Sequence, residues 1–503
     1  MRVMFVSVNQ LKSYRPVLPI GMITVATQVR AAGHDVHCVD LMFEEEEEQV
    51  IRRETARFRP DIVGISIRNV DSLNLLEPAI YTPLAREVAD CARSVQPNVK
   101  ILLGGPGFTT VPEDLMDFIG ADYGLVGFAE ETMPALLRAM EQGLELRGIP
   151  GVLFYEGNRY YKNPPSFSLD YGQVLPPDRA FYDPRYFEYA FETHDDITRV
   201  PATVQTKKGC VLECVFCSNF LIDGTGVTTR DPVRVADEVE RIATDGMDRF
   251  EIVDGVFNLP LHNAIGILRE FERRGLRLRW SCMINPGAVN QELVDLMAAT
   301  GCHEVEFGTD SCNNRVLGIL KKNFRKRQIY EVHRMFRDAG IRTMHCLFIG
   351  SPGDDRESVM ETFDVMDDLA FAGASDSHVY WTFGLRICRG TELFNIAVRE
   401  GLIRGDECFL VPKYYVSPQV MGDDTLLEQI RERVLRNQNW YLWWGLNSIS
   451  LRERLEMAMR ENLAIERSVL EHMRNRPKPP VTPPLVTLPL VTDLPLVSEV
   501  RSA

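Results

Sequence analysis

Residues 209–217 read GCVLECVFC, which places Cys210, Cys214 and Cys217 at the spacing C-x3-C-x2-C. Thiolates are the ligands that iron–sulfur clusters select. A structural zinc site normally takes four ligands, and no fourth cysteine or histidine follows at comparable spacing. Three thiolates leave one iron of a four-iron cluster open to another ligand. The motif therefore predicts a [4Fe–4S] cluster with an open coordination position.

Strand and helix patterns alternate around and after this motif. Short β-rich runs lie at 202–206, 249–253, 279–283, 304–308, 343–350 and 378–383, and helical patterns lie at 232–245, 291–299, 327–339 and 356–371. Six repeats of this kind are typical of a partial barrel with a parallel sheet. We expect this partial (β/α)6 barrel to span residues 196–400, with the cysteine motif on the loop after its first strand.

An earlier series of the same kind opens the chain. Its strand patterns lie at 2–8, 34–40, 61–67, 100–103 and 121–126, and its first helical pattern lies at 20–33. This order predicts a doubly wound, Rossmann-like α/β domain over residues 1–145, with ligands at the carboxyl ends of the strands. The dinucleotide fingerprint G-x-G-x-x-G is missing after the first strand. Residues 146–195, with a predicted hairpin around 157–158, are interpreted as a connector.

The end of the chain divides into two parts. Residues 401–475 are predicted to form a C-terminal helical region, because charged helical patterns fill most of it. Its aromatic cluster is interpreted as a packing face against the barrel, with a wall of the substrate cavity as the alternative. The cluster comprises Trp440, Tyr441, Trp443 and Trp444. Residues 476–503 repeat the phrase LPLV, are rich in proline and are predicted to be disordered.

Composition and charge narrow the class of protein. The formal net charge of −15 argues against a nucleic-acid partner, because phosphate binding needs a basic surface. The basic run at 321–327 is interpreted as a solvated helix start. No run of about 18 apolar residues predicts a membrane span, and the N-terminus does not resemble a signal peptide. Cysteines grouped at ligand spacing favour a reducing cytoplasm over an exported disulfide protein.

The cysteine motif and several later positions resemble the radical S-adenosylmethionine (radical SAM) superfamily. The resemblance covers roughly residues 196–400: 307–311 (FGTDS) is similar to the family's G-x-E-S with Asp for Glu, and 348–353 (FIGSPG) is similar to its G-x-P-G turn. It implies a [4Fe–4S] cluster that binds SAM and cleaves it reductively to a 5′-deoxyadenosyl radical. The SAM contacts that it assigns are Phe216, Asp254, Asp310, Ser311, Gly350 and Pro352.

The first domain resembles the cobalamin-binding domain found upstream of many radical SAM cores. P-x-G at 19–21, V-G-I-S at 63–66 and G-G at 104–105 match, whereas 127–130 reads GFAE in place of G-E-G-E. The cobalamin contacts that the resemblance assigns are Asn9, Gly21, Asp40, Ser66, Arg68, Gly104, Gly105, Gly127 and Glu130. The D-x-H-x-x-G motif is absent, which implies cobalamin without a histidine on cobalt. Arg68 is expected near the lower corrin face, or alternatively bound to a corrin amide or a helix carbonyl.

Together the two resemblances imply a methyltransferase that moves a methyl group from SAM, via methylcobalamin, to an unactivated carbon of a small-molecule or natural-product substrate. They imply an external electron donor of the flavodoxin or ferredoxin type. An alternative enzyme keeps both cofactors and catalyses a non-methylating cyclisation, rearrangement or oxidation. A third hypothesis is a SAM- or cobalamin-responsive binding protein, which the three intact motif cysteines disfavour. No catalytic side chain is assigned.

Overall fold

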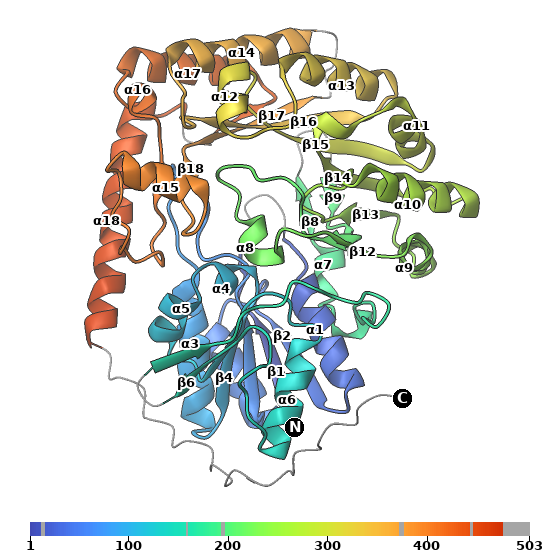
Figure 1. Ribbon diagram of the computed structural model, residues 1–503, viewed down its shortest axis with the longest axis vertical. Coiled ribbons are helices and arrows are strands. Elements are labelled where there is room, and N and C mark those ends of the chain that lie inside the picture. Colours follow the sequence, from blue (N-terminus) through green and yellow to red (C-terminus); the bar gives the residue numbers. More distant parts are fainter. Residues whose placement is uncertain (12–15, 157–158, 193–196, 372–376, 443–445, 476–503) are drawn as a thin grey trace, which may run out of the picture.

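Two seven-stranded sheets organise the chain, one in each half (Figure 1). The computed structural model describes all residues except 12–15, 157–158, 193–196, 372–376, 443–445 and 476–503. The tail that was predicted to be disordered therefore lies outside the described residues. Within the described part, no helix is both long and apolar enough to cross a membrane.

The first sheet has the strand order β2-β1-β3-β4-β5-β6-β7. Its strands are β1 (Arg2–Ser7), β2 (Asp35–Asp40), β3 (Ile62–Ser66), β4 (Lys100–Gly104), β5 (Tyr123–Leu125), β6 (Val152–Glu156) and β7 (Arg159–Lys162). Strands β1 to β5 are parallel, which confirms the doubly wound prediction. The predicted hairpin is formed by the antiparallel strands β6 and β7, and it extends this sheet into the residues interpreted as a connector.

Helices cover both faces of the first sheet. They are α1 (Ile20–Ala31), α2 (Glu47–Phe58), α3 (Thr82–Val95), α4 (Pro106–Thr110), α5 (Pro112–Ile119) and α6 (Thr132–Gln142). Alternate residues of β1 point to opposite faces, so Phe5 packs in one cluster with α1 and α6 while Met4 packs in another with α2, α3 and α5. Burial on both faces explains why these strands read as continuous apolar runs.

A short irregular segment leads to the second half. Its elements are a 3-10 helix (Arg179–Phe181), α7 (Arg185–Glu188), β8 (Ala190–Glu192) and β9 (Ile197–Arg199). Tyr186 of α7 is fully buried and anchors this segment against the first domain through apolar contacts with Leu18 and Met42.

The second sheet is parallel throughout and has the order β10-β13-β14-β15-β16-β17-β20. Its strands are β10 (Ala202–Val204), β13 (Arg249–Ile252), β14 (Arg279–Ile284), β15 (Cys302–Asp310), β16 (Arg342–Ile349), β17 (His378–Phe383) and β20 (Trp440–Tyr441). No pairing joins β20 to β10 among the described residues, so the barrel is open. The six predicted strands are confirmed, and β20 adds a short strand at the edge.

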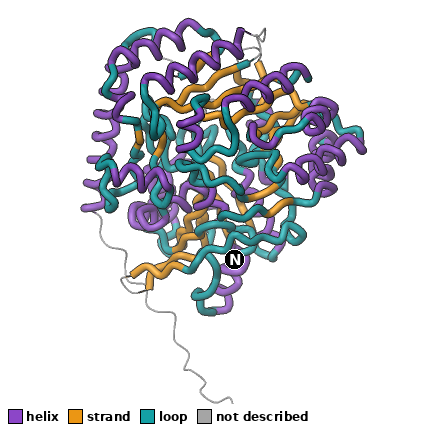
Figure 2. The backbone as a smooth tube through the Cα atoms, turned by 45° about the horizontal axis from the view of Figure 1, so that its top comes forward, coloured by secondary structure: helices purple, strands orange, loops and turns teal. Residues whose placement is uncertain are grey.

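Helices form the outer layer of this partial barrel (Figure 2). They are α9 (Pro232–Thr244), α10 (Leu261–Arg274), α11 (Gln291–Ala299), α12 (Asn314–Ile319), α13 (Lys326–Asp338), α14 (Arg356–Phe371) and the short 3-10 helix Pro286–Ala288. A small hairpin of β11 (Lys207–Lys208) and β12 (Thr228–Thr229) flanks α8 (Asn219–Asp223), which Figure 1 places between the two halves.

The C-terminal region is largely helical, as predicted, but it also returns a strand to the barrel. Two short elements, β18 (Leu385–Arg386) and α15 (Glu392–Arg399), lead from the barrel into it. Its own elements are β19 (Tyr414–Tyr415), α16 (Pro418–Met421), α17 (Asp424–Arg436), β20 and α18 (Leu451–Asn475). Trp440 packs at 5.4 Å from Trp381 and 5.6 Å from Phe363, measured between ring centroids. The interpretation of the aromatic cluster as a packing face is confirmed for Trp440, while Trp443 and Trp444 lie outside the described residues.

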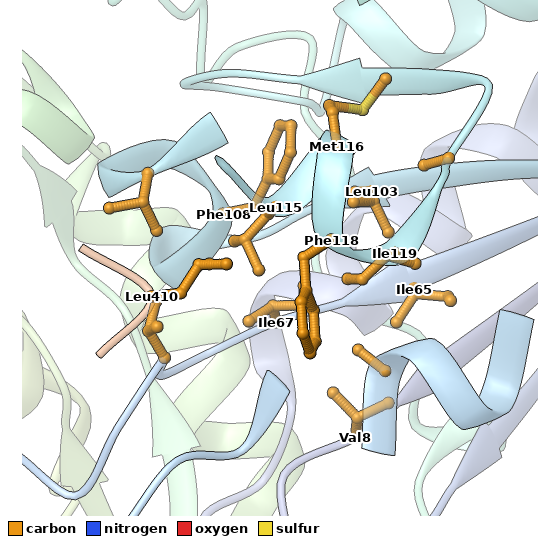
Figure 3. Close-up of a cluster of buried hydrophobic side chains, with 14 of the residues drawn as sticks. Val8, Ile65, Ile67, Leu103, Phe108, Leu115, Met116, Phe118, Ile119 and Leu410 are labelled. Atoms are coloured by element: carbon orange, nitrogen blue, oxygen red, sulfur yellow. The ribbon is translucent and has the colours of Figure 1, made fainter. Parts of the chain in front are cut away.

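Segments from the C-terminal half complete the core of the first domain. Figure 3 shows Leu410, which follows α15, in the same apolar cluster as Phe108 and Phe118 of the first domain. Helix α18 runs alongside both halves in Figure 1, and its His472 packs edge-on against Phe118 at 5.2 Å between ring centroids. These contacts bind the two halves to each other over an extended area.

A buried ion pair joins the same two halves. Arg386 Nε lies 2.7 Å from Asp71 Oδ2, and the two side chains are only 10% and 1% exposed. Asp71 belongs to the loop after β3, three residues beyond Arg68. The ion pair therefore ties the loop that carries Arg68 to the barrel.

Candidate active site

Most of the residues predicted to contact cobalamin surround one cavity at the carboxyl ends of the first sheet. The cavity has a volume of about 330 Å³, within the range of small-molecule sites. Eight of the nine predicted residues line it, namely Asn9, Gly21, Ser66, Arg68, Gly104, Gly105, Gly127 and Glu130. The chain order reverses between β1 and β3, so the cavity lies where doubly wound sheets bind their ligands.

Asp40, the ninth residue, is not among those that line the cavity. Its carboxylate accepts hydrogen bonds from the Tyr186 hydroxyl at 2.9 Å and from the Met42 N–H at 3.1 Å. Burial raises the pKa of Asp40 to about 6, although these hydrogen bonds oppose the rise. Because β2 is an edge strand whose end is covered by Tyr186, Asp40 holds the segment around α7 to the first sheet. A contact between Asp40 and cobalamin stays a prediction.

Two glycines bring bare backbone to the wall of the cavity. Gly105 has φ 99° and ψ 169°, a conformation that is essentially restricted to glycine. A Cβ on Gly105 would lie 2.6 Å from the carbonyl oxygen of Ile67. A Cβ on Gly104 would meet no heavy atom within 4 Å, so this position is open toward a ligand. The pair lets a bulky ligand approach the end of β4 closely.

Two buried polar atoms at this cavity fit a ligand that offers both donors and acceptors. Among the described residues, Asn9 Nδ2 and Glu130 Oε2 have no hydrogen-bond partner, and both residues are about nine-tenths buried or more, at 6% and 5% exposure. An unpaired buried group costs about 1–3 kcal/mol. The amide side chains of a corrin ring provide C=O acceptors for Asn9 and N–H donors for Glu130. The unpaired atoms of the cavity wall therefore match the hydrogen-bonding groups of a corrin ring.

The barrel supplies the facing wall of the same cavity. The residues from it are Thr203, Gln205, Lys208, Ile222, Asp223 and Val253. Lys208 Nζ forms an ion pair with Glu130 Oε1 across the domain boundary and lies 4.3 Å from the centroid of the Phe128 ring. Because this pair is buried, it fixes the start of the cysteine-bearing loop against the first domain.

The three cysteines lie on the loop between β11 and α8, and all three are half-buried. The Val215 N–H donates to the carbonyl oxygen of Leu320 at 3.3 Å, and the Leu393 N–H donates to the carbonyl oxygen of Val215 at 2.9 Å. The Asn219 N–H donates to Cys217 Sγ at 3.5 Å. Backbone contacts from two distant segments thus hold the loop in place.

The chemistry of these donors fits a cluster better than a single ion. Burial raises the pKa of the Cys217 thiol to about 11, and the neighbouring Cys214 and Cys210 add to the rise, so the three sulfurs lie within electrostatic range. In the described parts of the chain, no three or more His, Cys, Asp or Glu side chains are close enough to hold one metal ion. The ligands of a four-iron cluster stand further apart than those of one ion. Three thiolates on one loop therefore fit a [4Fe–4S] cluster.

Phe216 lies on this loop, and Asp254 contacts the segment that precedes it. Phe216 packs edge-on against Phe348 of β16, with ring centroids 4.9 Å apart. The buried Asp254 carboxylate accepts hydrogen bonds from the Thr206 N–H at 2.8 Å, the Thr206 hydroxyl and the Lys207 N–H at 3.3 Å. Asp254 therefore positions the segment that leads into the cysteine motif. Contacts of either residue with SAM stay predictions.

Asp310 and Ser311 lie at the end of β15, and both side chains are buried. Asp310 adopts φ 61°, and its Oδ2 lies 2.5 Å from Lys322 Nζ. Ser311 Oγ accepts a hydrogen bond from the Asn313 N–H at 3.2 Å and lies 3.4 Å from Thr362 Oγ1. Both predicted SAM contacts thus have protein partners, and their contacts with SAM stay predictions.

Gly350 and Pro352 form the turn after β16, which is held by a residue that the sequence did not single out. Asp354 Oδ2 accepts hydrogen bonds from the N–H groups of Gly350 at 3.1 Å and Ser351 at 2.8 Å. The Ser358 hydroxyl donates to Asp354 Oδ1 at 2.7 Å. Burial raises the pKa of Asp354 to about 6. The hydroxyl of Ser351 is buried with no partner among the described residues, so this predicted turn has polar capacity left for a ligand.

Three charged residues of the site were not predicted from the sequence. Lys208 and Asp354 carry no motif signal, although one directly precedes the cysteine motif and the other follows the predicted turn. Lys322 belongs to the basic run that was interpreted as a solvated helix start. That interpretation is wrong for Lys322, which is buried in an ion pair with Asp310.

The comparisons with known proteins agree with this arrangement. Residues 6–137 match the B12 binding domain, and residues 204–366 match the Radical SAM superfamily. The chain therefore contains a B12 binding domain followed by a radical SAM domain. These two domains imply cobalamin, SAM and a [4Fe–4S] cluster as cofactors.

Two relatives and one solved structure illustrate the similarity. An uncharacterised methyltransferase of Pyrococcus horikoshii is 27% identical, over 76% of this chain and 79% of its own. The tryptophan 2-C-methyltransferase of Streptomyces laurentii is 26% identical, over 72% of this chain and 70% of its own. The radical SAM methyltransferase TsrM of Kitasatospora setae, solved with tryptophan and a SAM analogue, has a TM-score of 0.76 at 21% identity, over 94% of this chain and 99% of its own. The fold of this chain therefore corresponds to nearly the whole of that enzyme.

Proposed function

We propose that this protein is a cobalamin-dependent radical SAM C-methyltransferase that transfers a methyl group from SAM, by way of cobalamin, to a carbon of a small-molecule substrate. One observation carries the proposal: a single cavity has walls from both domains, and α8, which forms part of it, begins two residues after Cys217. Cobalamin supplies methyl transfer, and SAM at the cluster supplies the radical that abstracts hydrogen from the substrate. Both chemistries would then meet in one space.

In this proposal, the residues of the chain bind and orient the corrin and keep water out of the cavity. Asn9 and Glu130 offer their unpaired polar atoms to the corrin amides, and Gly104 leaves room for the ring. The buried pair of Lys208 and Glu130 joins the two domains at the wall of the cavity and limits the entry of water from that side. We propose Arg68, which also lines the cavity, as a further contact of the corrin.

The named relatives support methylation over other outcomes. The methyltransferase of Streptomyces laurentii acts, by its name, on a carbon of tryptophan, and the similarity to it spans 420 residues. We propose a small-molecule or natural-product substrate for this chain as well. An electron donor of the flavodoxin or ferredoxin type would reduce the cluster, which requires a reducing compartment such as the cytoplasm.

An anaerobic assay with labelled SAM tests the proposal. The protein is reconstituted with iron, sulfide and cobalamin, supplied with a reductant and methyl-deuterated SAM, and its nucleosides and cobalamin are examined by mass spectrometry. We expect 5′-deoxyadenosine together with a deuterated methyl group on cobalamin, and C217S should make no 5′-deoxyadenosine. Cobalamin binding and 5′-deoxyadenosine without label transfer would replace the proposal with a non-methylating cyclisation, rearrangement or oxidation. Absence of both products would point to a binding protein.

A further inference from the structure

A buried lysine lies beside the cysteine loop, and neither cofactor assignment uses it. Lys322 follows α12, and its side chain is only 7% exposed. Its Nζ lies 2.5 Å from Asp310 Oδ2, 6.0 Å from the centroid of the Phe216 ring and 5.5 Å from that of Phe324. Because Phe216 sits between Cys214 and Cys217 in the chain, this ammonium group stands next to the predicted cluster ligands.

The lysine reaches the inner side of the barrel. A Cβ built on Gly308 would lie 3.9 Å from Lys322 Nζ. Gly308 alternates along β15 with Phe307, which packs in the cluster under the outer helices. The side chain of Lys322 therefore approaches β15 from the face opposite the helices, where the cysteine loop lies.

We propose that Lys322 sets the reduction potential of the cluster by holding a buried positive charge next to it, and that Asp310 moderates this charge. When the cluster accepts one electron from its donor, the iron–sulfur core changes from 2+ to 1+ while the thiolates are unchanged. The cluster thus becomes more negative by one unit. A nearby cation in a low-dielectric site stabilises the reduced form and raises the potential, because charge and burial are among the factors that set it.

Asp310 makes the proposal testable in both directions. Its carboxylate neutralises part of the lysine charge, so its removal exposes the cluster to more positive charge, whereas removal of Lys322 leaves a buried negative charge. The two single variants should therefore shift the potential in opposite directions. A purely structural role of the ion pair predicts that both variants loosen the same contact and change the cluster in the same way. Lys321 is exposed and provides a matched control, because a solvated charge is screened.

The experiment is a redox titration of the reconstituted full-length protein, monitored by the electron paramagnetic resonance signal of the reduced cluster at matched iron content. We expect a more negative midpoint potential for K322M, a more positive one for D310N and the wild-type value for K321M. The double variant K322M/D310N should return toward the wild-type value. Equal potentials for K322M and the wild type, or shifts of the same sign for both single variants, would overturn the proposal.

A second comparison keeps the proposal falsifiable if K322M does not hold its cluster. K322R keeps a cation at this position, because arginine is not deprotonated in proteins, and a midpoint potential of K322R well below that of the wild type would then refute the role of the Lys322 charge. The titration needs only the cluster and no methyl transfer. A failure of the proposed methyltransferase activity would therefore leave this result standing, and the reverse also holds.

Discussion

Two glycine substitutions at the end of β4 distinguish a residue needed for the backbone conformation from a residue that leaves space for the ligand. Gly105→Ala places a Cβ 2.6 Å from the carbonyl oxygen of Ile67 on a residue with φ 99°. Gly104→Ala places a Cβ where no heavy atom lies within 4 Å, on a residue that lines the cavity. We expect G105A to destabilise the fold and G104A to weaken only the binding of cobalamin.

The magnitude follows from the backbone geometry. A non-glycine residue in this region costs about 1–3 kcal/mol, and the close contact with Ile67 adds to that cost, so G105A should lose at least about 2 kcal/mol. With a urea m-value on the order of 2–3 kcal/mol/M, this loss lowers the unfolding midpoint by roughly 0.7–1 M. G104A should unfold at the wild-type midpoint, because its methyl group meets nothing in the protein.

Urea unfolding monitored by circular dichroism measures the stability, and the change in cobalamin absorbance on titration measures the affinity. Both variants are compared with the wild type in the same buffer under anaerobic conditions. An unfolding midpoint of G105A within 0.2 M of the wild type, taken as about 0.5 kcal/mol by the same m-value, would refute the reasoning about strain. Undiminished cobalamin affinity of G104A would refute the placement of the corrin against this wall.

Three further predictions concern the domain contact, a buried carboxyl and the cluster. R386L leaves Asp71 buried without its partner and should cost about 3–5 kcal/mol, seen as a lower midpoint in thermal or urea unfolding, whereas a midpoint equal to wild type would contradict the ion-pair argument. The pKa of Asp354 is raised from 3.8 to about 6, so the folded state holds the proton more tightly and stability is lost as pH rises through that range. D354N should remove this loss between about pH 4 and 6, and an unchanged pH profile of urea unfolding would show that Asp354 does not titrate there. C217S should lower the iron bound after reconstitution, because one of the three thiolates is missing, and wild-type iron and absorbance would refute that ligand assignment.

The sheets could be predicted from the sequence because their strands are buried and continuous in the chain. The apolar runs at 61–67 and 343–350 each carry enough β-branched and apolar residues to indicate a strand without knowledge of its neighbours. Strand β20 could not be predicted, because two residues form no recognisable period and their pairing with β17 depends on tertiary contacts. The hairpin of β6 and β7 was predicted, but its membership of the first sheet was not, since register with β5 leaves no local signal.

The candidate site, too, could be predicted only where its signal is local in the sequence. The cysteine motif is local, so its spacing alone indicates the cluster. The buried partner of Lys322 is Asp310. The sequence of a basic run does not show which of its lysines or arginines is buried in an ion pair. Asp40 is the opposite case. Its place at the end of β2 matches the family pattern, but its carboxylate accepts a hydrogen bond from Tyr186, which lies far along the chain and could not be foreseen.

The shared core of the two halves has a consequence for biosynthesis. Phe118 of the first domain is covered by α18, and the same cluster takes in Leu410 and Val469. Leu410, Val469 and α18 are synthesised hundreds of residues after β1. During translation, part of the apolar surface of the first domain is therefore uncovered until they emerge from the ribosome. A polypeptide that ends before residue 451 would keep that surface exposed to solvent and to other chains.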